Sequence, residues 1–351
     1  MMIYQILFVL CLGLFTALYL YWGFTRLTAE NRQIFAAMPK QRIKDSFFQG
    51  VNFTWYGLLS ANGVCVAVIL FLILSSSMGT PIMASLCLIT LLLSVLLPSA
   101  RWIARIVEKK KHTFTIGGSV FTGILISPWV ICGFNHFEPV PGFRFPIVET
   151  LAAFAISYSL GESLGRLSCV SFGCCYGKAL SETHPLLQRF FSKHHFIYRG
   201  ATRKACYASG LEGVKVLPIQ AVTSVIYAVS ALIGLGLFFA GHPGTALVLT
   251  LGVTQTWRSF SEFFRADYRG EGTFSAYQIM GIIAGTYALV IALIFRQNSP
   301  MVPDIAQGLL FLWNPLVILT VQGLWLVVFM YMGKSTVTES TLHFHVVKDH
   351  I

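Results

Sequence analysis

Long apolar runs restrict the folds available to this chain more than any other feature of its sequence. A helix that crosses the hydrocarbon core of a bilayer needs roughly 20 predominantly apolar residues. With 55% hydrophobic and 11% charged residues, the composition excludes an ordinary soluble domain. The sequence therefore predicts an all-α, polytopic integral membrane helix bundle of about nine transmembrane helices. The runs that predict these helices lie at 3–25, 51–75, 80–99, 115–134, 147–168, 216–240, 244–264, 275–296 and 306–332.

The positive charge of the chain is divided unevenly between the two sides of this predicted bundle. When successive gaps are assigned to alternate sides, one side receives 23 of the 25 Lys and Arg residues, and the other only Arg144 and Arg296. Loops rich in Lys and Arg are typical of the cytoplasmic side. We therefore expect the basic side to be cytoplasmic, with the N-terminus outside and the C-terminus inside. This topology explains the net charge of +11, and we expect no nucleic acid partner.

The stretch GESLGRLSCVSFGCCYG, residues 161–177, closes the fifth run and organises the predicted site. An arginine at the end of a membrane helix is costly unless it pairs or meets an anion. Glu162 can pair with Arg166 four residues later. The pattern favours a surface that binds a negatively charged group, and the alternative is a helix end whose Arg snorkels and whose small residues pack. At helical spacing one face carries Arg166, Cys169, Gly173, Cys174 and Gly177.

A second charged cluster ends the run at 244–264. Arg258 and Glu262 lie four residues apart and Arg265 follows at i+7, so that all three share a helix face. Two arginines and a carboxylate at the membrane boundary suit an anionic head group beside a positioned acid or base. The alternative is an interfacial charge cluster that anchors the helix.

The cysteines on the basic side do not have the spacing of a common metal site. They are expected to be reduced in the cytoplasm, and C-x4-C-C fits no usual zinc pattern, so we predict neither a metal nor another cofactor. The polar stretch 178–215 that follows is predicted to cap the central site, with a plain solvated loop as the alternative. Segment 26–50 is predicted to be a basic, solvated linker, with a segment that lies on the membrane surface as the alternative. The cysteines concerned are Cys169, Cys174, Cys175 and Cys206.

Short motifs in order over roughly residues 53–296 resemble those of the prolipoprotein diacylglyceryl transferase family. WYGL at 55–58 resembles the family's Trp-Tyr-Gly-Leu, and Gly117-Gly118 resembles its His-Gly-Gly. GRLSCVSFGCCYG at 165–177 is similar to the signature Gly-Arg-x-x-Asn-Phe-x-x-x-Glu-x-x-Gly. The remaining similarities are LPIQ at 217–220 to His-Pro-x-Gln, RSFSEFFRADYRG at 258–270 to Arg-x-x-x-Glu-Phe-x-Arg, and Gln278 to a Gln in the family's final span.

The resemblance implies a division of the chain and a reaction. A seven-helix core at 51–298, with its cap at 178–215, would be flanked by an extra transmembrane helix and linker at 1–50 and an extra transmembrane helix and tail at 299–351. The family transfers the diacylglyceryl group of phosphatidylglycerol to a lipoprotein cysteine, in the bacterial inner membrane. The implied catalytic residues are Arg166, Cys169, Cys174, Glu262 and Tyr56, and the implied head-group ligands are Arg166, Arg258, Arg265, Gly117, Gly118, Gly177 and Gln220.

The sequence departs from the family at chemically important positions. Ile116 stands in place of the motif histidine, and Cys169 and Cys174 stand in place of the signature Asn and Glu. A Cys beside Arg at a helix end can have a lowered pKa, so thiolates are expected to replace the missing groups. The family's site also opens to the outer face, whereas the charge count assigns the matching residues to the cytoplasmic face. We give precedence to the charge count and expect a different acceptor.

Three functions remain open from the sequence. The first is a membrane transferase that takes a diacylglyceryl group from an anionic, phosphatidylglycerol-like phospholipid and passes it to a lipoprotein or another thiol acceptor. The second is a non-enzymatic protein on the same fold that binds a lipid or anion, or transports a sulfur group. The third is a structural membrane subunit, in which Arg166 serves assembly alone.

Overall fold

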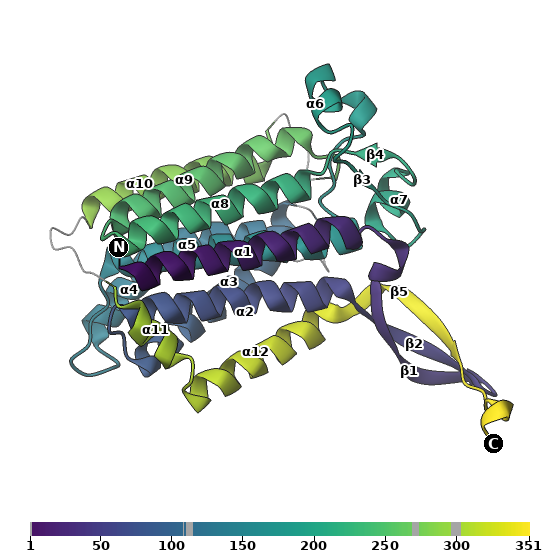
Figure 1. The fold of residues 1–351 in the computed structure, drawn as a ribbon, viewed down its shortest axis with the longest axis horizontal. Coiled ribbons are helices and arrows are strands. Elements are labelled where there is room, and N and C mark those ends of the chain that lie inside the picture. The colour runs from purple at the N-terminus through teal and green to yellow at the C-terminus, as the bar shows by residue number, and fades with distance from the viewer. Residues whose placement is uncertain (1, 108, 110–114, 269–273, 296–302) are drawn as a thin grey trace.

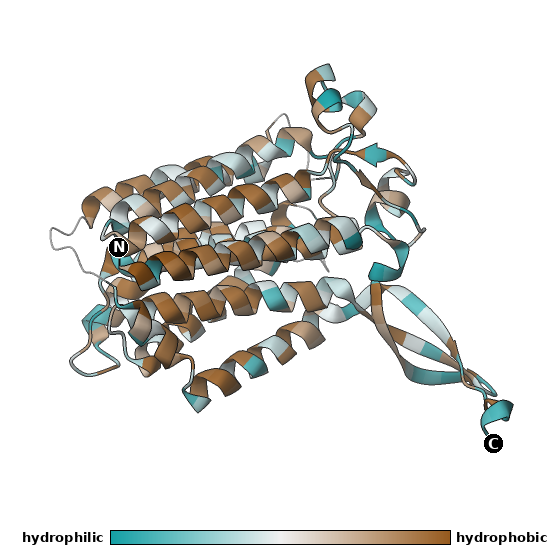
Figure 2. Ribbon diagram, in the orientation of Figure 1, coloured by the Kyte–Doolittle hydropathy of each residue, from teal (hydrophilic) through white to brown (hydrophobic). Residues whose placement is uncertain are grey.

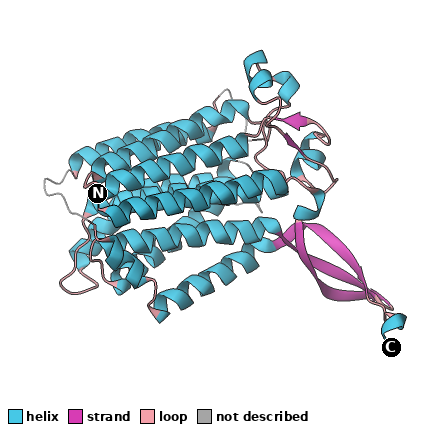
Figure 3. Cartoon of the chain, in the orientation of Figure 1, coloured by secondary structure: helices cyan, strands magenta, loops and turns pink. Residues whose placement is uncertain are grey.

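The computed structural model describes residues 2–107, 109, 115–268, 274–295 and 303–351. Helices make up most of this part of the chain and run side by side along the molecule (Figures 1 and 3). The predicted polytopic helical bundle is confirmed. The long helices are α1 (Ile3–Arg26), α2 (Trp55–Ser77), α3 (Ile82–Val107), α4 (Ile116–Phe137), α5 (Ile147–Phe172), α8 (Ile219–Phe239), α9 (Pro243–Ser261), α10 (Ala276–Ile294) and α12 (Pro315–Gly333).

Two of these helices are more polar than the rest. Within the described residues, seven helices are long and apolar enough to cross a membrane, and α5 and α9 are the long helices outside this group. Nearly every residue of α5 is buried, including Glu149 and Glu162. Because neighbouring helices surround α5 instead of lipid, its charged side chains avoid the hydrocarbon that would penalise them.

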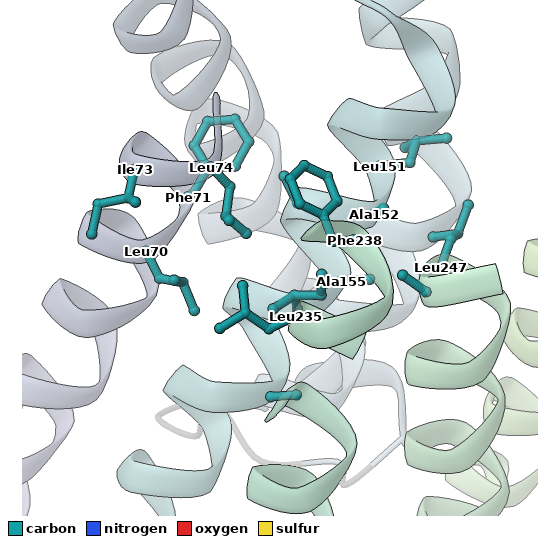
Figure 4. Packing of buried hydrophobic residues seen from close by; sticks show 14 of the residues in the cluster. Leu70, Phe71, Ile73, Leu74, Leu151, Ala152, Ala155, Leu235, Phe238 and Leu247 are labelled. Carbon is teal, nitrogen blue, oxygen red and sulfur yellow. The ribbon is translucent and has the colours of Figure 1, made fainter. Parts of the chain in front are cut away.

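Close packing between α2 and α5 forms the centre of the bundle. A Cβ atom added to Gly63 would lie 2.8 Å from the carbonyl oxygen of Gly161, so only glycine allows the two backbones this close. Further along the same pair, the rings of Phe71 and Phe154 stack with centroids 4.1 Å apart. Figure 4 shows apolar side chains of α2, α5, α8 and α9 meeting around this centre.

Hydrophilic residues gather beyond one end of the bundle (Figure 2), where most of the described Lys and Arg residues also lie. Among described Lys and Arg residues, Arg144 lies in the loop between α4 and α5, at the opposite end, where it pairs with the partly exposed Glu138. Lys110, Lys111, Arg269 and Arg296 fall outside the described residues. The two ends therefore differ in charge as the sequence predicts, and the cytoplasmic assignment stays a prediction.

Segment 26–50 is not a linker, which corrects the sequence prediction. Strands β1 (Ile34–Lys44) and β2 (Phe47–Thr54) form a hairpin, and β5 (Lys334–His343) pairs with β2, giving an antiparallel sheet of order β1-β2-β5. The sheet extends away from the helices at the basic end (Figure 3). No local pattern could reveal a strand whose partner lies almost 300 residues later.

The last apolar run is likewise two helices instead of one. Helix α11 (Ile305–Phe311) ends before Asn314, whose side chain caps α12 by accepting a hydrogen bond from the N–H of Leu316 at 2.9 Å. Pro315 occupies the first turn of α12, where a missing N–H costs nothing. This asparagine–proline pair explains the break.

Segment 178–215 is folded and not an open loop. It contains helices α6 (Pro185–Phe190) and α7 (Lys204–Ser209), and strands β3 (Phe196–Ile197) and β4 (Lys215–Val216) pair within it. Arg203, with 0% of its surface exposed, donates hydrogen bonds to carbonyl oxygens of Leu27, Thr28, Ala29 and Ser171. This one side chain ties the cap to the ends of α1 and α5.

Candidate functional site

The chain reverses at the end of α5, which brings three thiols together. Gly173 adopts a left-handed conformation (φ 68°, ψ 35°), and the N–H of Cys174 donates to the carbonyl of Cys169 at 3.1 Å. This six-to-one hydrogen bond beside a left-handed glycine is a Schellman motif, which ends a helix. The helix predicted to continue to Gly177 therefore stops at Phe172. The reversal leaves the sulfur atoms of Cys169, Cys174 and Cys175 within 4.8 Å of one another.

The segment after this reversal joins three parts of the site. The N–H of Lys178 donates to the carbonyl of Phe264 at 2.9 Å, and the N–H of Ala266 donates to that of Tyr176 at 3.1 Å. These bonds hold Gly177 opposite Arg265. The carbonyl of Lys178 also accepts from Leu217, just before α8, at 3.0 Å. The ends of α5 and α9 and the start of α8 are thereby fixed together.

A small polar pocket lies where these segments meet. Its free volume of about 10 Å³ is close to that of one water, so a larger polar group requires side chains to move apart. The pocket contains all three arginines that the sequence singled out, together with one of the three thiols. Its lining is Arg166, Cys175, Ile219, Gln220, Thr223, Tyr227, Arg258, Ser261, Glu262 and Arg265.

Two of the three arginines are anchored by carboxylates. Arg166 donates from Nη2 to Glu162, its partner one helical turn earlier. Arg265 makes two hydrogen bonds with Asp267, at 2.8 and 2.9 Å, and its Nη1 lies 3.5 Å from Glu262. Because these side chains are nearly buried, the carboxylates offset part of the cost of holding guanidinium groups away from water.

Three polar atoms of the pocket have no partner among the described residues. They are two donors, Arg166 Nε and Arg258 Nη1, and one acceptor, Gln220 Oε1. The nitrogen of the Gln220 amide is hydrogen-bonded: Nε2 donates to the Cys174 carbonyl at 2.9 Å and to the Tyr198 hydroxyl at 3.1 Å. Buried polar groups are nearly always hydrogen-bonded. Orphaned donors on two arginines therefore indicate a site for an acceptor-rich, negatively charged group.

A larger apolar cavity adjoins the polar pocket inside the bundle. Its volume is about 250 Å³, and its lining comes from α2, α3, α4, α5, α9 and α10. Tyr158 lines this cavity and Tyr227 lines the pocket, and their rings meet edge to face with centroids 6.2 Å apart. The two spaces thus offer apolar surface and fixed positive charge side by side, which suits an amphipathic ligand.

A family model described as prolipoprotein diacylglyceryl transferase matches residues 46–294. The chain belongs to the prolipoprotein diacylglyceryl transferase family. No curated protein and no solved structure matches it. Family membership and the apolar helices support an integral membrane protein of the diacylglyceryl transferase type, acting in lipoprotein biosynthesis. The matched stretch includes all the pocket residues, whereas α1, α11 and α12 lie outside it.

Most residues implied by the family resemblance lie at or beside the pocket. Tyr56 is close enough to the three thiols and to Arg166 to interact with them electrostatically. Gly117 lies against Arg258, where an added Cβ would collide with the guanidinium. Gly118 is the exception, because it faces Ile103 of α3. The roles assigned to these residues stay predictions.

The expected low pKa of the cysteines is wrong for Cys174. Hydrogen bonding with the thiols of Cys169 and Cys175, followed by burial, raises the pKa of Cys174 well above its ordinary value. The sequence argument considered a neighbouring arginine but not two neighbouring thiols, which share one small space after the Schellman turn.

Two pocket residues were missed by sequence reasoning although a signal existed. Thr223 and Tyr227 follow Gln220 at three and seven residues, which places all three on one face of α8. Thr223 also accepts a hydrogen bond from Trp257 of α9 at 3.0 Å. A polar stripe on an otherwise apolar membrane helix was the available sign.

The paired glycines of α4 allow a matched test of the site. Gly117→Ala is expected to lower diacylglyceryl transfer about tenfold with little loss of thermal stability, because the new methyl collides mainly with the flexible end of Arg258 and lies 3.3 Å from the ring of Tyr277. Gly118→Ala is expected to destabilise the protein by about 1–3 kcal/mol, because its methyl would lie 2.7 Å from Ile103 Cβ in the α3–α4 contact. Thermal unfolding and transfer rates of both variants separate the two effects. Equal transfer by Gly117→Ala and wild type would contradict the first expectation.

Proposed function

We propose that this protein is a membrane transferase that uses an anionic, phosphatidylglycerol-like phospholipid as donor and transfers its diacylglyceryl group to a thiol. The acceptor would be a lipoprotein cysteine or a related thiol, and the setting a bacterial inner membrane. The observation that carries the proposal is the pair of orphaned arginine donors beside the apolar cavity. The oxygens of a phosphodiester would accept hydrogen bonds from the arginine donors, and a diacylglyceryl group would fill the apolar cavity.

The pocket residues suit the individual parts of this reaction. The acceptor S–H bond breaks, a C–S bond forms at the glyceryl carbon, and that carbon's bond to the phosphate oxygen breaks, with the electron pair leaving on the phosphate. Arg166 and Arg258 would stabilise the charge gathering on this leaving group. Glu262 would accept the thiol proton. Cys169 and Cys174 occupy the positions of the family's Asn and Glu, and we retain them as part of the catalytic group.

The division of the chain supports a core that carries this chemistry. We propose residues 51–298 as the transferase core, with the segments 1–50 and 299–351 as additions to it. The pocket lies at the ends of α5 and α9, on the basic side of the bundle, which favours an acceptor that reaches the cytoplasmic face. The alternative is a protein that binds a lipid or anion, or carries a sulfur group, without transfer; the cluster of three thiols favours it over a purely structural subunit.

A reconstituted assay tests the proposal. Full-length protein in vesicles is supplied with phosphatidylglycerol labelled in its acyl chains and with cysteine-containing peptides carrying one thiol. Label attached to the peptide thiol, with stoichiometric release of glycerol phosphate, is expected. Retention of labelled lipid by the protein without any product would instead support the non-enzymatic alternative.

Glu262→Gln is expected to reduce transfer by roughly 10²–10⁴-fold, the usual contribution of a positioned base. Glutamine keeps the shape of the side chain but cannot take a proton. Arg265 should remain in place, because its two hydrogen bonds to Asp267 are shorter than its 3.5 Å contact with Glu262.

The matched control for this variant is Glu138→Gln, which removes an exposed carboxylate at the opposite end of the bundle. Its transfer rate should equal that of wild type. Lipid retention by Glu262→Gln should also be unchanged, since the arginines hold the donor. Wild-type transfer by Glu262→Gln would rule out the base assignment.

A further inference from the structure

The thiols of Cys169, Cys174 and Cys175 form a cluster with the dimensions of a metal site. All three sulfur atoms lie within 4.8 Å of one another, and those of Cys169 and Cys175 are 3.9 Å apart. Zinc–thiolate bonds of about 2.3 Å at tetrahedral angles put sulfur atoms about 3.8 Å apart. Closing the remaining gap takes side-chain shifts smaller than about 1 Å, by the same geometry. No disulfide joins any of the eight cysteines, all of which the structure describes.

The geometry points to a zinc site formed by Cys169, Cys174 and Cys175, with one coordination position open toward the polar pocket. The described part of the chain contributes no His or carboxylate to the cluster. Three protein ligands with an open fourth position are typical of catalytic zinc, whereas structural zinc takes four. The spacing C-x4-C-C predicted no metal because it matches no usual zinc pattern, and the turn at Gly173 is what brings the three sulfur atoms together.

The charges around the cluster favour zinc over a monovalent soft ion. Three thiolates bound to a divalent ion leave one net negative charge, and bound to Cu(I) they leave two. Arg166 and Arg265 both interact electrostatically with Cys175. These two arginines already pair with carboxylates, which leaves Arg258 as the main source of positive charge in the pocket beside Cys175. The less negative zinc complex therefore suits this surrounding better.

A ligand can reach the open coordination position from the polar pocket. Cys169 and Cys174 are buried at 6% and 8% exposure, whereas Cys175 is half-buried and belongs to the pocket lining. An ion held by all three would therefore have protein behind it and the pocket in front. The Schellman turn fixes this arrangement, because it sets the position of Cys174 relative to Cys169.

Resting on the proposed function, the zinc ion would bind the acceptor thiol. The ion would lower the pKa of the acceptor thiol, so that Glu262 can take its proton. The acceptor sulfur would then form the C–S bond as the glyceryl carbon–oxygen bond breaks and the phosphate departs with its electron pair. No oxidant or reductant is needed. The site would thus compensate for the family residues that Cys169 and Cys174 replace.

Metal analysis of the purified full-length protein tests the site without lipid or acceptor. The protein is kept reduced, loaded with zinc alone, and washed with a weak chelator. Wild type is expected to retain about one zinc per chain, and Cys169→Ser and Cys175→Ser at least tenfold less. Cys206→Ser is the matched control, since Cys206 is a buried thiol in the cap outside the cluster. Loading with cobalt should give thiolate-to-cobalt absorption in wild type and the control only.

Each result decides the proposal. Retained zinc that is lost only on substitution within the cluster supports it. Wild type without zinc, or zinc that survives Cys175→Ser, would overturn it. Thermal unfolding identifies a variant that has lost its fold, and the cobalt spectrum of wild type stands independently of any variant. Because no transfer is measured, failure of the zinc site leaves the transferase proposal intact, and the reverse also holds.

Discussion

Arg258→Gln is expected to lower diacylglyceryl transfer by about 10²–10³-fold, which is typical for loss of a preorganised donor to a developing anion. The reason is the orphaned Nη1 of Arg258, which is buried in the pocket without a partner among described residues. A donor atom held this way has already lost its water, so a phosphate oxygen gains its full interaction with it on binding. The measurement is label transfer per chain in reconstituted vesicles.

Two variants make this expectation specific. Arg258→Lys keeps the charge but loses the planar pair of donors, so its rate should fall between those of Arg258→Gln and wild type. Arg144→Gln removes an arginine that is exposed and paired at the opposite end, and should transfer at the wild-type rate. Equal rates for Arg258→Gln and Arg144→Gln would show that the pocket does not hold the donor phosphate.

The sequence predicted much of this pocket because helical spacing is reliable within a helix. Arg166 and Glu162 are one turn apart on α5 and form the expected ion pair. Arg258 and Glu262 both reach the pocket, although α9 ends at Ser261 and Glu262 begins a short 3-10 turn. A charged residue near the end of a membrane helix indicated the site because few surroundings tolerate a charge there.

What the sequence could not provide depends on chain reversal and long-range pairing. The three sulfur atoms converge because α5 stops at a left-handed glycine, whereas continued helical spacing placed Cys174 on the helix face itself. The sheet depends on β2 meeting β5, which comes from the far end of the chain. Asp267 anchors Arg265 from outside any helix. None of these contacts has a period that a sequence pattern reveals.

Arg203→Ala is expected to be the most destabilising single change in the cap, at about 3 kcal/mol or more, since buried acceptors left without donors cost about 1–3 kcal/mol each. Arg203 is completely buried and donates to four carbonyls from the ends of α1 and α5. Burial lowers its pKa, but an arginine stays charged, so its hydrogen bonds remain charge-assisted.

Thermal unfolding should show this loss as a decrease of about 6 °C or more, at roughly 2 °C per kcal/mol for a chain of this size. Limited proteolysis should then cut within 178–215 before it cuts the helices. Arg199→Ala is the matched control, because Arg199 belongs to the same cap but is exposed. The N–H of Ala205 also donates to the carbonyl of Gly173 at 2.9 Å, so a loosened cap should release the turn that groups the thiols. If Arg203→Ala unfolds at the temperature of Arg199→Ala, the cap is held by other contacts and the thiol cluster does not depend on it.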